Sequence, residues 1–143
     1  MVLLGCQRES SPSPSPKGPL IELRQSLQKA DRIVVSHVDK KRHYLISKAK
    51  AHALMEQVHL SGFRNYFQCI CYSDMVFYVY RGDELLEVFA YFEEGAFAWH
   101  QADWSGDAEL TMRSHDTLSM WFHEVLPGLD LLPEGSFIPP PID

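Results

Sequence analysis

Hydrophobic side chains between residues 66 and 100 follow the period of a β-strand, and short polar turns interrupt them at regular spacing. The runs cover residues 66–72, 75–80, 85–92 and 96–100. Successive side chains of a strand point to opposite faces, and turns at this spacing join antiparallel neighbours. The pattern therefore predicts a four-stranded antiparallel meander. Both faces of the run 75–80 are apolar or aromatic, so we expect that strand to be central and covered on both sides.

Helical and strand patterns flank the meander. A helix is predicted over 20–30, a second one starts at the N-cap Ser47 and stops at Ser61-Gly62, and a third runs from the N-cap Ser114 to Pro127-Gly128. The residues expected on their apolar faces are Leu20, Leu23, Leu27, Ala30, Ala51, Leu54, Met55, Val58, Leu118, Trp121, Phe122 and Val125. Residues 32–38 and 42–46 favour two further strands. We predict an α+β fold, an antiparallel sheet of about five to six strands with helices packed on one face.

Composition divides the chain into three parts. Residues 1–19 include alternating Ser and Pro from Ser11 to Pro16, and such a stretch buries too little apolar surface to fold, so we expect a disordered tether. Residues 20–128 are predicted to form a single α+β domain of ordinary size. Residues 129–143 lack periodicity and contain the triplet 139–141 of proline, which predicts a tail that lies along the surface or frays.

The charge argues against a nucleic-acid-binding protein. The net charge of the chain is −6 with neutral His, and residues 20–143 alone carry −7, because 11 basic and 18 acidic residues fall there. Binding to a phosphate backbone depends on neutralising it with Lys and Arg. The basic cluster at residues 40–43 is small against this background. We expect no nucleic-acid partner, and the sequence lacks the run of roughly 18 apolar residues that a membrane-spanning helix needs.

The segment Leu3-Leu4-Gly5-Cys6, followed by the Ser/Pro tether, resembles the lipobox of bacterial lipoproteins. The resemblance implies acylation of Cys6, cleavage just before it, and anchoring to a lipid bilayer in the bacterial cell envelope. A signal peptide has a basic segment and about 7–15 apolar residues before the cleavage site, whereas five residues precede Cys6. We therefore expect the reading frame to start further upstream. The alternative is an ordinary cysteine in a disordered leader of a cytoplasmic protein.

Cys69 and Cys71 are the second feature that could take part in chemistry. In the strand predicted over 66–72 they share one face, so two thiols could reach a common metal ion or redox partner. A disulfide between them is not expected, because an extended backbone holds the sulfur atoms apart. A zinc site needs further ligands, for which His37, His43 and His100 are the candidates. No second cysteine or histidine pair has metal-ligand spacing, so core packing is the favoured interpretation.

The loop that follows the last predicted strand is dense in aromatic and acidic residues. A ligand- or partner-binding site is predicted there, because an indole offers contact area together with a donor. Its residues are Trp99, His100, Asp103, Trp104 and Asp107. The alternative is that the loop folds its tryptophans onto the last helix.

The remaining titratable residues form no catalytic grouping in the sequence. The carboxylates of the meander are expected to make a solvated acidic surface, and they are Asp74, Asp83, Glu84, Glu87, Glu93 and Glu94. The seven histidines are expected to be scattered over the surface. No hydrolase nucleophile motif, phosphate loop or dinucleotide fingerprint occurs, so we expect no cofactor.

These features favour a small, non-enzymatic envelope lipoprotein whose domain binds a protein or a small ligand through the loop 99–107. One alternative is a thiol- or metal-dependent enzyme that uses Cys69 and Cys71. Another is a cytosolic acidic inhibitor or immunity-type protein that masks a basic partner, since its negative charge would attract one.

Overall fold

A computed structural model describes residues 17–99 and 104–141 of the chain. Residues 1–16 of the predicted tether, which include the lipobox with Cys6, and the site candidates His100 and Asp103 lie outside these residues. Residues 17–19, also predicted as tether, belong to the first helix instead. The described part is an α+β fold with three helices and an eight-stranded antiparallel sheet, which confirms the predicted fold class. The sheet has more strands than the five to six expected from the sequence.

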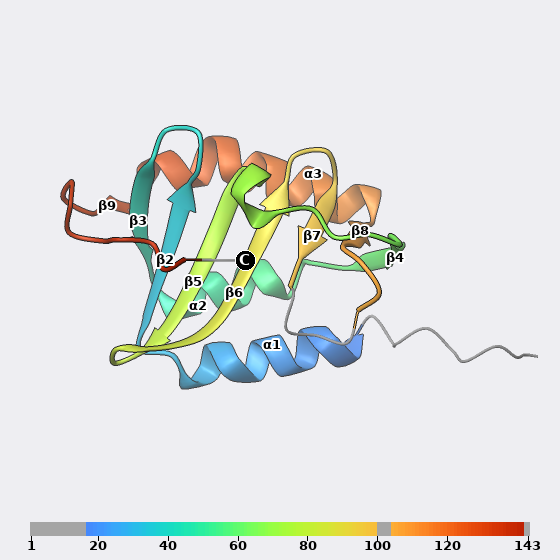
Figure 1. Ribbon diagram of the computed structural model, residues 1–143, viewed down its shortest axis with the longest axis horizontal. Helices are drawn as coiled ribbons and strands as arrows, with labels where there is room; N and C mark the ends of the chain where they lie inside the picture. Colours follow the sequence, from blue (N-terminus) through green and yellow to red (C-terminus); the bar gives the residue numbers. More distant parts are fainter. Residues whose placement is uncertain (1–16, 100–103, 142–143) are drawn as a thin grey trace, which may run out of the picture.

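The sheet runs across the whole molecule in Figure 1, with β9 and β3 at one edge and β4 at the other. Its strands are β2 (Arg32–His37), β3 (Arg42–Ile46), β4 (Leu60–Phe63), β5 (Met75–Arg81), β6 (Glu84–Phe92), β7 (Ala96–Ala98), β8 (Ala108–Leu110) and β9 (Asp130–Leu131). The order is β4-β8-β7-β6-β5-β2-β3-β9. The strand β5 lies between β6 and β2, and its residues 75–80 are buried, which confirms the predicted central strand.

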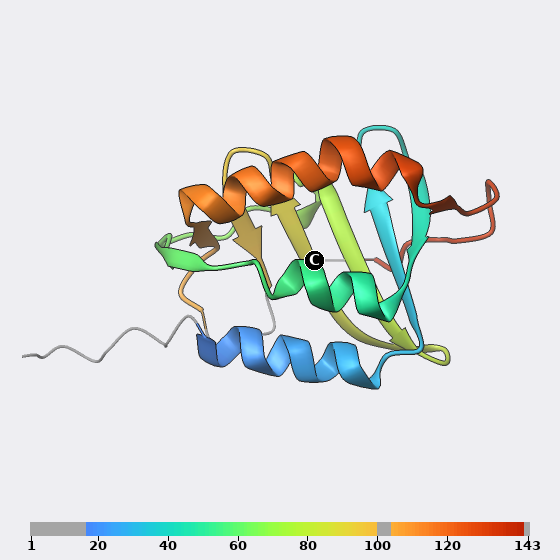
Figure 2. The same cartoon turned by 180° about the vertical axis from the view of Figure 1, so that it is seen from behind.

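The three helices cover one face of the sheet, seen in front in Figure 2. They are α1 (Lys17–Lys29), α2 (Lys48–Met55) and α3 (Met112–Met120), and α3 continues through a π turn (Trp121–Val125) into a 3-10 turn (Leu126–Gly128). The helix faces predicted from the sequence are buried there, except that Val125 is half-buried. Burial of these apolar faces against the sheet is the main stabilising term of such a layer.

The other face of the sheet, here called the open face, carries a smaller hydrophobic cluster. Val34 of β2 and Val76 and Tyr78 of β5 belong to it. A 3-10 turn, η1 (Ile70–Tyr72), covers part of this face, and the C-terminal tail crosses it in front of β3 and β2 in Figure 1. The tail is held by β9, which pairs with β3, and by the buried ring of Phe137.

The first strand of the predicted meander is absent, because residues 64–69 form a loop and 70–72 form η1. The loop is tied to Asp107, whose backbone N–H donates to the carbonyl of Tyr66 at 3.0 Å and whose carboxylate accepts from the N–H of Gln68 at 2.9 Å. Gly106 makes this approach possible, since a Cβ there would lie 2.2 Å from the carbonyl oxygen of Arg64. The segment 66–72 is therefore a loop and a turn and not a strand, and of its apolar side chains Ile70 is buried while Tyr66, Phe67 and Tyr72 are exposed.

The ends of the second and third helices also differ from the prediction. The helix α2 starts after the N-cap Ser47 as predicted but ends at Met55, and Ser61-Gly62 lie within the strand β4. The N-cap of α3 is Thr111, not Ser114. Ser114 is buried, where its hydroxyl accepts from the N–H of His59 at 2.8 Å and donates to the carbonyl of Gln57 at 2.9 Å. These bonds hold the segment before β4 against α3, and no local sequence pattern predicts this contact.

Candidate ligand-binding site

A hollow of about 470 Å³ opens on the open face, between η1 and the C-terminal tail. We call it the open-face hollow. Its floor consists of Ser36 in β2, Val38 directly after β2, and Val76 and Tyr78 in β5. This volume falls in the range of about 300–1,000 Å³ typical of sites for small organic molecules.

One wall of the hollow is η1, from which Ile70 and Cys71 line it. Ile70 is buried in the open-face cluster, and its carbonyl accepts bonds from both the N–H and the hydroxyl of Ser73. The hydrogen bonds close the turn itself, and the buried side chain of Ile70 packs the turn onto the open face of the sheet.

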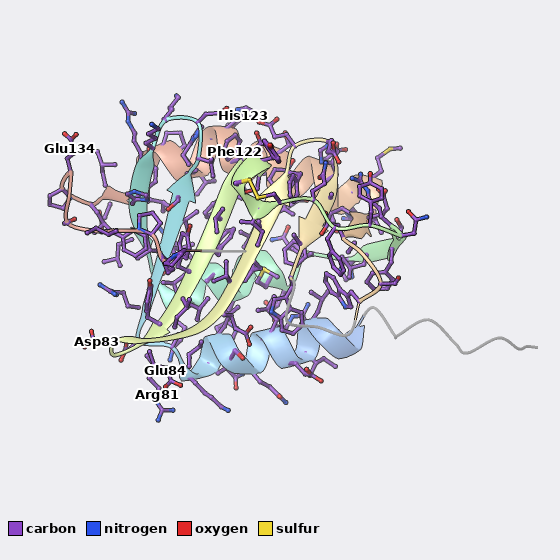
Figure 3. The ribbon with its side chains drawn as sticks, viewed as in Figure 1. Arg81, Asp83, Glu84, Phe122, His123 and Glu134 are labelled. Carbon is purple, nitrogen blue, oxygen red and sulfur yellow. A yellow bond between two sulfur atoms is a disulfide. The ribbon has the colours of Figure 1, made fainter. Side chains whose placement is uncertain are left out.

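Cys69 and Cys71 form a disulfide, drawn in yellow in Figure 3 above the upper end of β5 and β6. The expectation that these residues would not be disulfide-bonded is wrong. It assumed an extended strand, whereas the turn η1 sets their Cα atoms 5.1 Å apart, within the usual range for disulfides. In this state neither sulfur is a thiolate ligand. Over residues 17–99 and 104–141, no group of three or more His, Cys, Asp or Glu side chains is placed to hold a metal ion.

The opposite wall is the C-terminal tail, from which Pro139 and Pro140 line the hollow. Phe137 anchors this wall, with ring centroids 5.1 Å from His43 and 5.4 Å from Tyr78. The N–H of Leu132 also donates to the carbonyl of His43 at 2.8 Å, which extends the pairing of β9 with β3. The tail therefore packs against the sheet as part of the site.

Polar groups gather at the end of the hollow near the β2–β3 turn. His43 is hydrogen bonded through Nδ1 to the buried hydroxyl of Ser36, at 2.6 Å. The ring of His37 packs on Phe122 on the helix side, with centroids 4.6 Å apart. Burial lowers the pKa of both histidines below the usual 6.5, and the charge of Lys40 lowers that of His37 further, against opposing effects of nearby carboxylates. Both imidazoles are therefore mainly neutral at pH 7.

The phenol of Tyr78 completes the polar part of the lining. Burial raises the pKa of Tyr78 to about 12, so its hydroxyl stays protonated and can donate or accept a hydrogen bond over the whole physiological range. The site thus combines an apolar floor and walls with a few uncharged polar groups and one lysine, Lys41.

The predicted binding loop lies elsewhere, at the far end of the sheet. Trp99 and Trp104 are only 3% and 6% exposed, and their rings meet edge to face with centroids 5.9 Å apart. Asp107 is fully buried and binds the backbone of the loop 64–69. These three side chains serve the core on the helix side, and the structure does not bring them to the open-face hollow.

The sequence predicted that all carboxylates of the meander are solvated, and for Glu87 this prediction is wrong. Glu87 is buried on the helix side, where it accepts hydrogen bonds from the indole of Trp99 at 2.8 Å and from the hydroxyl of Ser26 at 2.6 Å. Asp83 and Glu84 are exposed at the β5–β6 turn, where Figure 3 shows them at the lower tip of the sheet.

Arg64 joins two acidic residues of separate elements, Glu94 in the β6–β7 turn and Glu109 in β8. The bond from Nε of Arg64 to Glu109 is 2.6 Å long, and NH1 of the same side chain contacts Glu94. This network fixes the sheet edge that carries β4 and β8, and it makes no contact with the hollow.

The sequence did not single out the open-face hollow, because three distant segments form it: residues 36–43, 70–78 and 139–140. Two segments that contribute to the hollow are visible in the sequence, the basic cluster at 40–43 and the proline triplet at 139–141. Nothing in the sequence shows that these two segments lie close together in the fold. Comparison of the chain with protein-family models, curated proteins and solved structures found no match.

Proposed function

We propose that this protein is a non-enzymatic binding module that takes a small, largely apolar molecule in the open-face hollow. The observation that carries the proposal is the hollow itself, which has small-molecule size, apolar floor and walls, and few polar groups. Such a lining gains free energy by removing apolar ligand surface from water, while the polar groups orient the ligand.

The walls of the hollow support the proposal because they are fixed before any ligand enters. The tail is fastened by β9 and Phe137, and η1 is fastened by Ile70 and closed by the disulfide of Cys69 with Cys71. A preorganised site avoids the entropic cost of ordering its walls when it binds.

The distance of 2.6 Å between the hydroxyl of Ser36 and Nδ1 of His43 is one that a catalytic nucleophile and its general base also have. Within residues 17–99 and 104–141, no carboxylate is hydrogen bonded to His43, whereas a catalytic histidine is normally oriented by such a third group. Ser36 is also buried beneath the open face. The pair is better suited to holding one histidine tautomer for ligand orientation.

Titration with the neutral fluorophore N-phenyl-1-naphthylamine tests the binding proposal. We expect saturable binding of one molecule per chain, measured by its fluorescence. The variant Val38→Phe fills the floor of the hollow and Pro140→Trp fills it from the tail wall, so each should weaken binding at least tenfold. The matched control is Val88→Phe, since Val88 is a partly buried valine of the same face outside the hollow.

Far-UV circular dichroism of each variant shows whether it is folded. If the wild-type chain does not bind the fluorophore, or if Val88→Phe weakens binding as much as the two filling variants, the open-face hollow is not the binding site.

We also propose that the domain is held at the bacterial cell envelope through Cys6. The lipobox-like segment 3–6 and the Ser/Pro tether support this location, and so does the disulfide of Cys69 with Cys71, because disulfides persist in oxidising compartments outside the cytosol. No helix in residues 17–99 or 104–141 has the length and apolar character to cross a bilayer.

Metabolic labelling with a palmitate analogue tests the location. The gene is expressed together with its upstream genomic sequence, and the labelled product should partition with membranes. The variant Cys6→Ser should lose the label and become soluble. An unlabelled wild-type product in the soluble fraction would overturn the proposed anchor and leave the binding proposal untouched.

A further inference from the structure

We propose that the open-face hollow selects small anionic amphiphiles, with the anionic head group paired to Lys41 and the apolar body lying on the floor. This inference rests on the proposed function and adds the chemical class of the ligand. The lining contains Lys41, His37 and His43 and no Asp or Glu, although residues 20–143 carry a net charge of −7. The hollow is thus a local positive site on an acidic domain, which complements an anion.

Lys41 is the group that carries this charge at neutral pH. The two histidines of the lining are mainly neutral there, because burial lowers the pKa of each. Among the described residues, Lys41 takes part in no ion pair, so its ammonium group is available to a ligand. A lysine ammonium next to an apolar wall binds a carboxylate or sulfonate more strongly than it would in open water, because the wall displaces solvent.

The backbone of Lys41 adds a second, independent argument. Its φ of 52° lies in the left-handed region, where glycine or asparagine is the usual choice and other residues cost free energy. Its N–H donates to the carbonyl of Val38 at 3.2 Å and closes the β2–β3 turn. A lysine at this position is therefore not explained by the turn, whereas a role for its side chain at the hollow explains it.

The neighbouring basic residues provide a contrast within the same turn. Lys40 and Arg42 line a second hollow of about 360 Å³ between the turn and the tail, and they do not line the open-face hollow, whereas Lys41 and His43 line both. The second hollow also contains Glu134, which Figure 3 shows at the outer end of the tail loop. Asp39 and Asp74 lie close enough to His37 to raise its pKa, but neither lines the open-face hollow. In the part of the chain that the structure describes, Lys41 is thus the one lysine or arginine that borders this acid-free lining.

The volume of the hollow limits the size of the ligand. A volume of about 470 Å³ accommodates one small molecule and not the two acyl chains of a phospholipid. The polar groups lie at the end of the hollow near the turn, so one head group at that end and one apolar body along Val76 and Ile70 match the lining. We therefore assign a free monocarboxylate with a hydrocarbon body as the ligand class, and not a membrane lipid.

Competition against bound N-phenyl-1-naphthylamine tests the assignment on the full chain expressed without lipidation. The competitors are decanoate and 1-decanol, which share the chain length and differ in the charge of the head group. The quantity compared is the ratio of decanoate to decanol affinity. We expect Lys41→Gln to lower this ratio roughly tenfold, the size of one charge-assisted hydrogen bond. Because both competitors are measured on the same variant, any change in fluorophore affinity cancels from the ratio. The matched control Lys40→Gln removes the same charge from the same turn and should change the ratio less than about twofold.

The outcomes separate the two proposals. Failure of the wild-type chain to bind the neutral fluorophore contradicts the proposed function. Normal fluorophore binding with a ratio that Lys41→Gln leaves unchanged, or that Lys40→Gln lowers equally, overturns the anion assignment alone. Co-sedimentation with phosphatidylglycerol vesicles that is lost in Lys41→Gln, without any change in decanoate competition, would overturn it in favour of a membrane lipid.

Discussion

Trp99 donates its indole N–H to the buried carboxylate of Glu87 at 2.8 Å, beneath the helix α1. Ser26 of that helix donates to the other oxygen of the same carboxylate at 2.6 Å. One acidic side chain therefore ties β6, the segment after β7 and α1 together. A buried polar group of this kind stabilises a fold only while its partners stay satisfied.

The variant Glu87→Ala should lower the free energy of unfolding by about 2 kcal/mol, because it leaves the buried indole N–H of Trp99 and the half-buried hydroxyl of Ser26 without their acceptor. Glu87→Gln keeps an oxygen for Trp99 and can donate to the Ser26 hydroxyl, so it should cost less than about 1 kcal/mol. Urea unfolding followed by circular dichroism measures both. Equal stability of the wild type and Glu87→Ala would show that the carboxylate is not a structural element.

The ring of Phe137 fastens the tail to the open face, and its removal tests whether the tail is a wall of the site. Phe137→Ala should lower the free energy of unfolding by about 3 kcal/mol and weaken binding of N-phenyl-1-naphthylamine. The control is Ile138→Ala, since Ile138 is 83% exposed and should contribute to neither quantity. A folded Phe137→Ala variant that binds the fluorophore normally would remove the tail from the site.

The parts of the fold that local patterns specify were predicted correctly. The apolar face of α1, the N-cap Ser47, and the strands β2, β3, β5 and β6 each follow from a short window of sequence. In these elements the spacing of apolar residues and the positions of turn residues indicate the same structure, because each helix or strand buries its own apolar side chains in the core. The predicted class, helices packed on one face of an antiparallel sheet, follows from their order.

The parts that depend on distant contacts could not be predicted. Leu60 of β4 pairs with Leu110 of β8, and Asp107 holds the loop 64–69 that had the pattern of a strand. The open-face hollow has the same origin, since η1 comes from the middle of the sequence and the tail from its C-terminal part. The disulfide joins residues only two apart, but it depends on the turn η1, which replaces the strand that the local pattern predicts. No local periodicity carries such pairings, because tertiary contacts override local propensity.

The disulfide makes a prediction about thiol content and stability. Untreated protein expressed without lipidation should react with iodoacetamide at Cys6 alone, and reduction should expose two more thiols, counted by mass spectrometry. Replacing Cys69 and Cys71 together by serine should lower the free energy of unfolding by about 1.5 kcal/mol, a small effect because the closed loop is short. Cys6→Ser is the control and should leave stability unchanged. Three reactive thiols in protein that was never reduced would contradict the bond.

Two buried tyrosines predict a loss of stability at alkaline pH. Burial raises the pKa of Tyr78 and of Tyr91 to about 12, above the value near 10 of an unfolded chain. The unfolded state therefore releases these protons first, so the stabilising contribution is complete below pH 10 and is lost as the pH rises to 12. Each phenol should account for about 2–3 kcal/mol at the upper end of that window.

Urea midpoints measured at pH 8, 10 and 11.5 test this loss, with Tyr91→Phe as the variant. It removes the hydroxyl that contacts Nδ1 of His115 at 3.1 Å, so it should be less stable than the wild type at pH 8 and should lose less stability above pH 10. Tyr72→Phe is the matched control, because Tyr72 is 79% exposed and should follow the wild-type profile throughout. A Tyr91→Phe profile parallel to the wild type between pH 10 and 11.5 would show that the ionisation of Tyr91 does not limit alkaline stability.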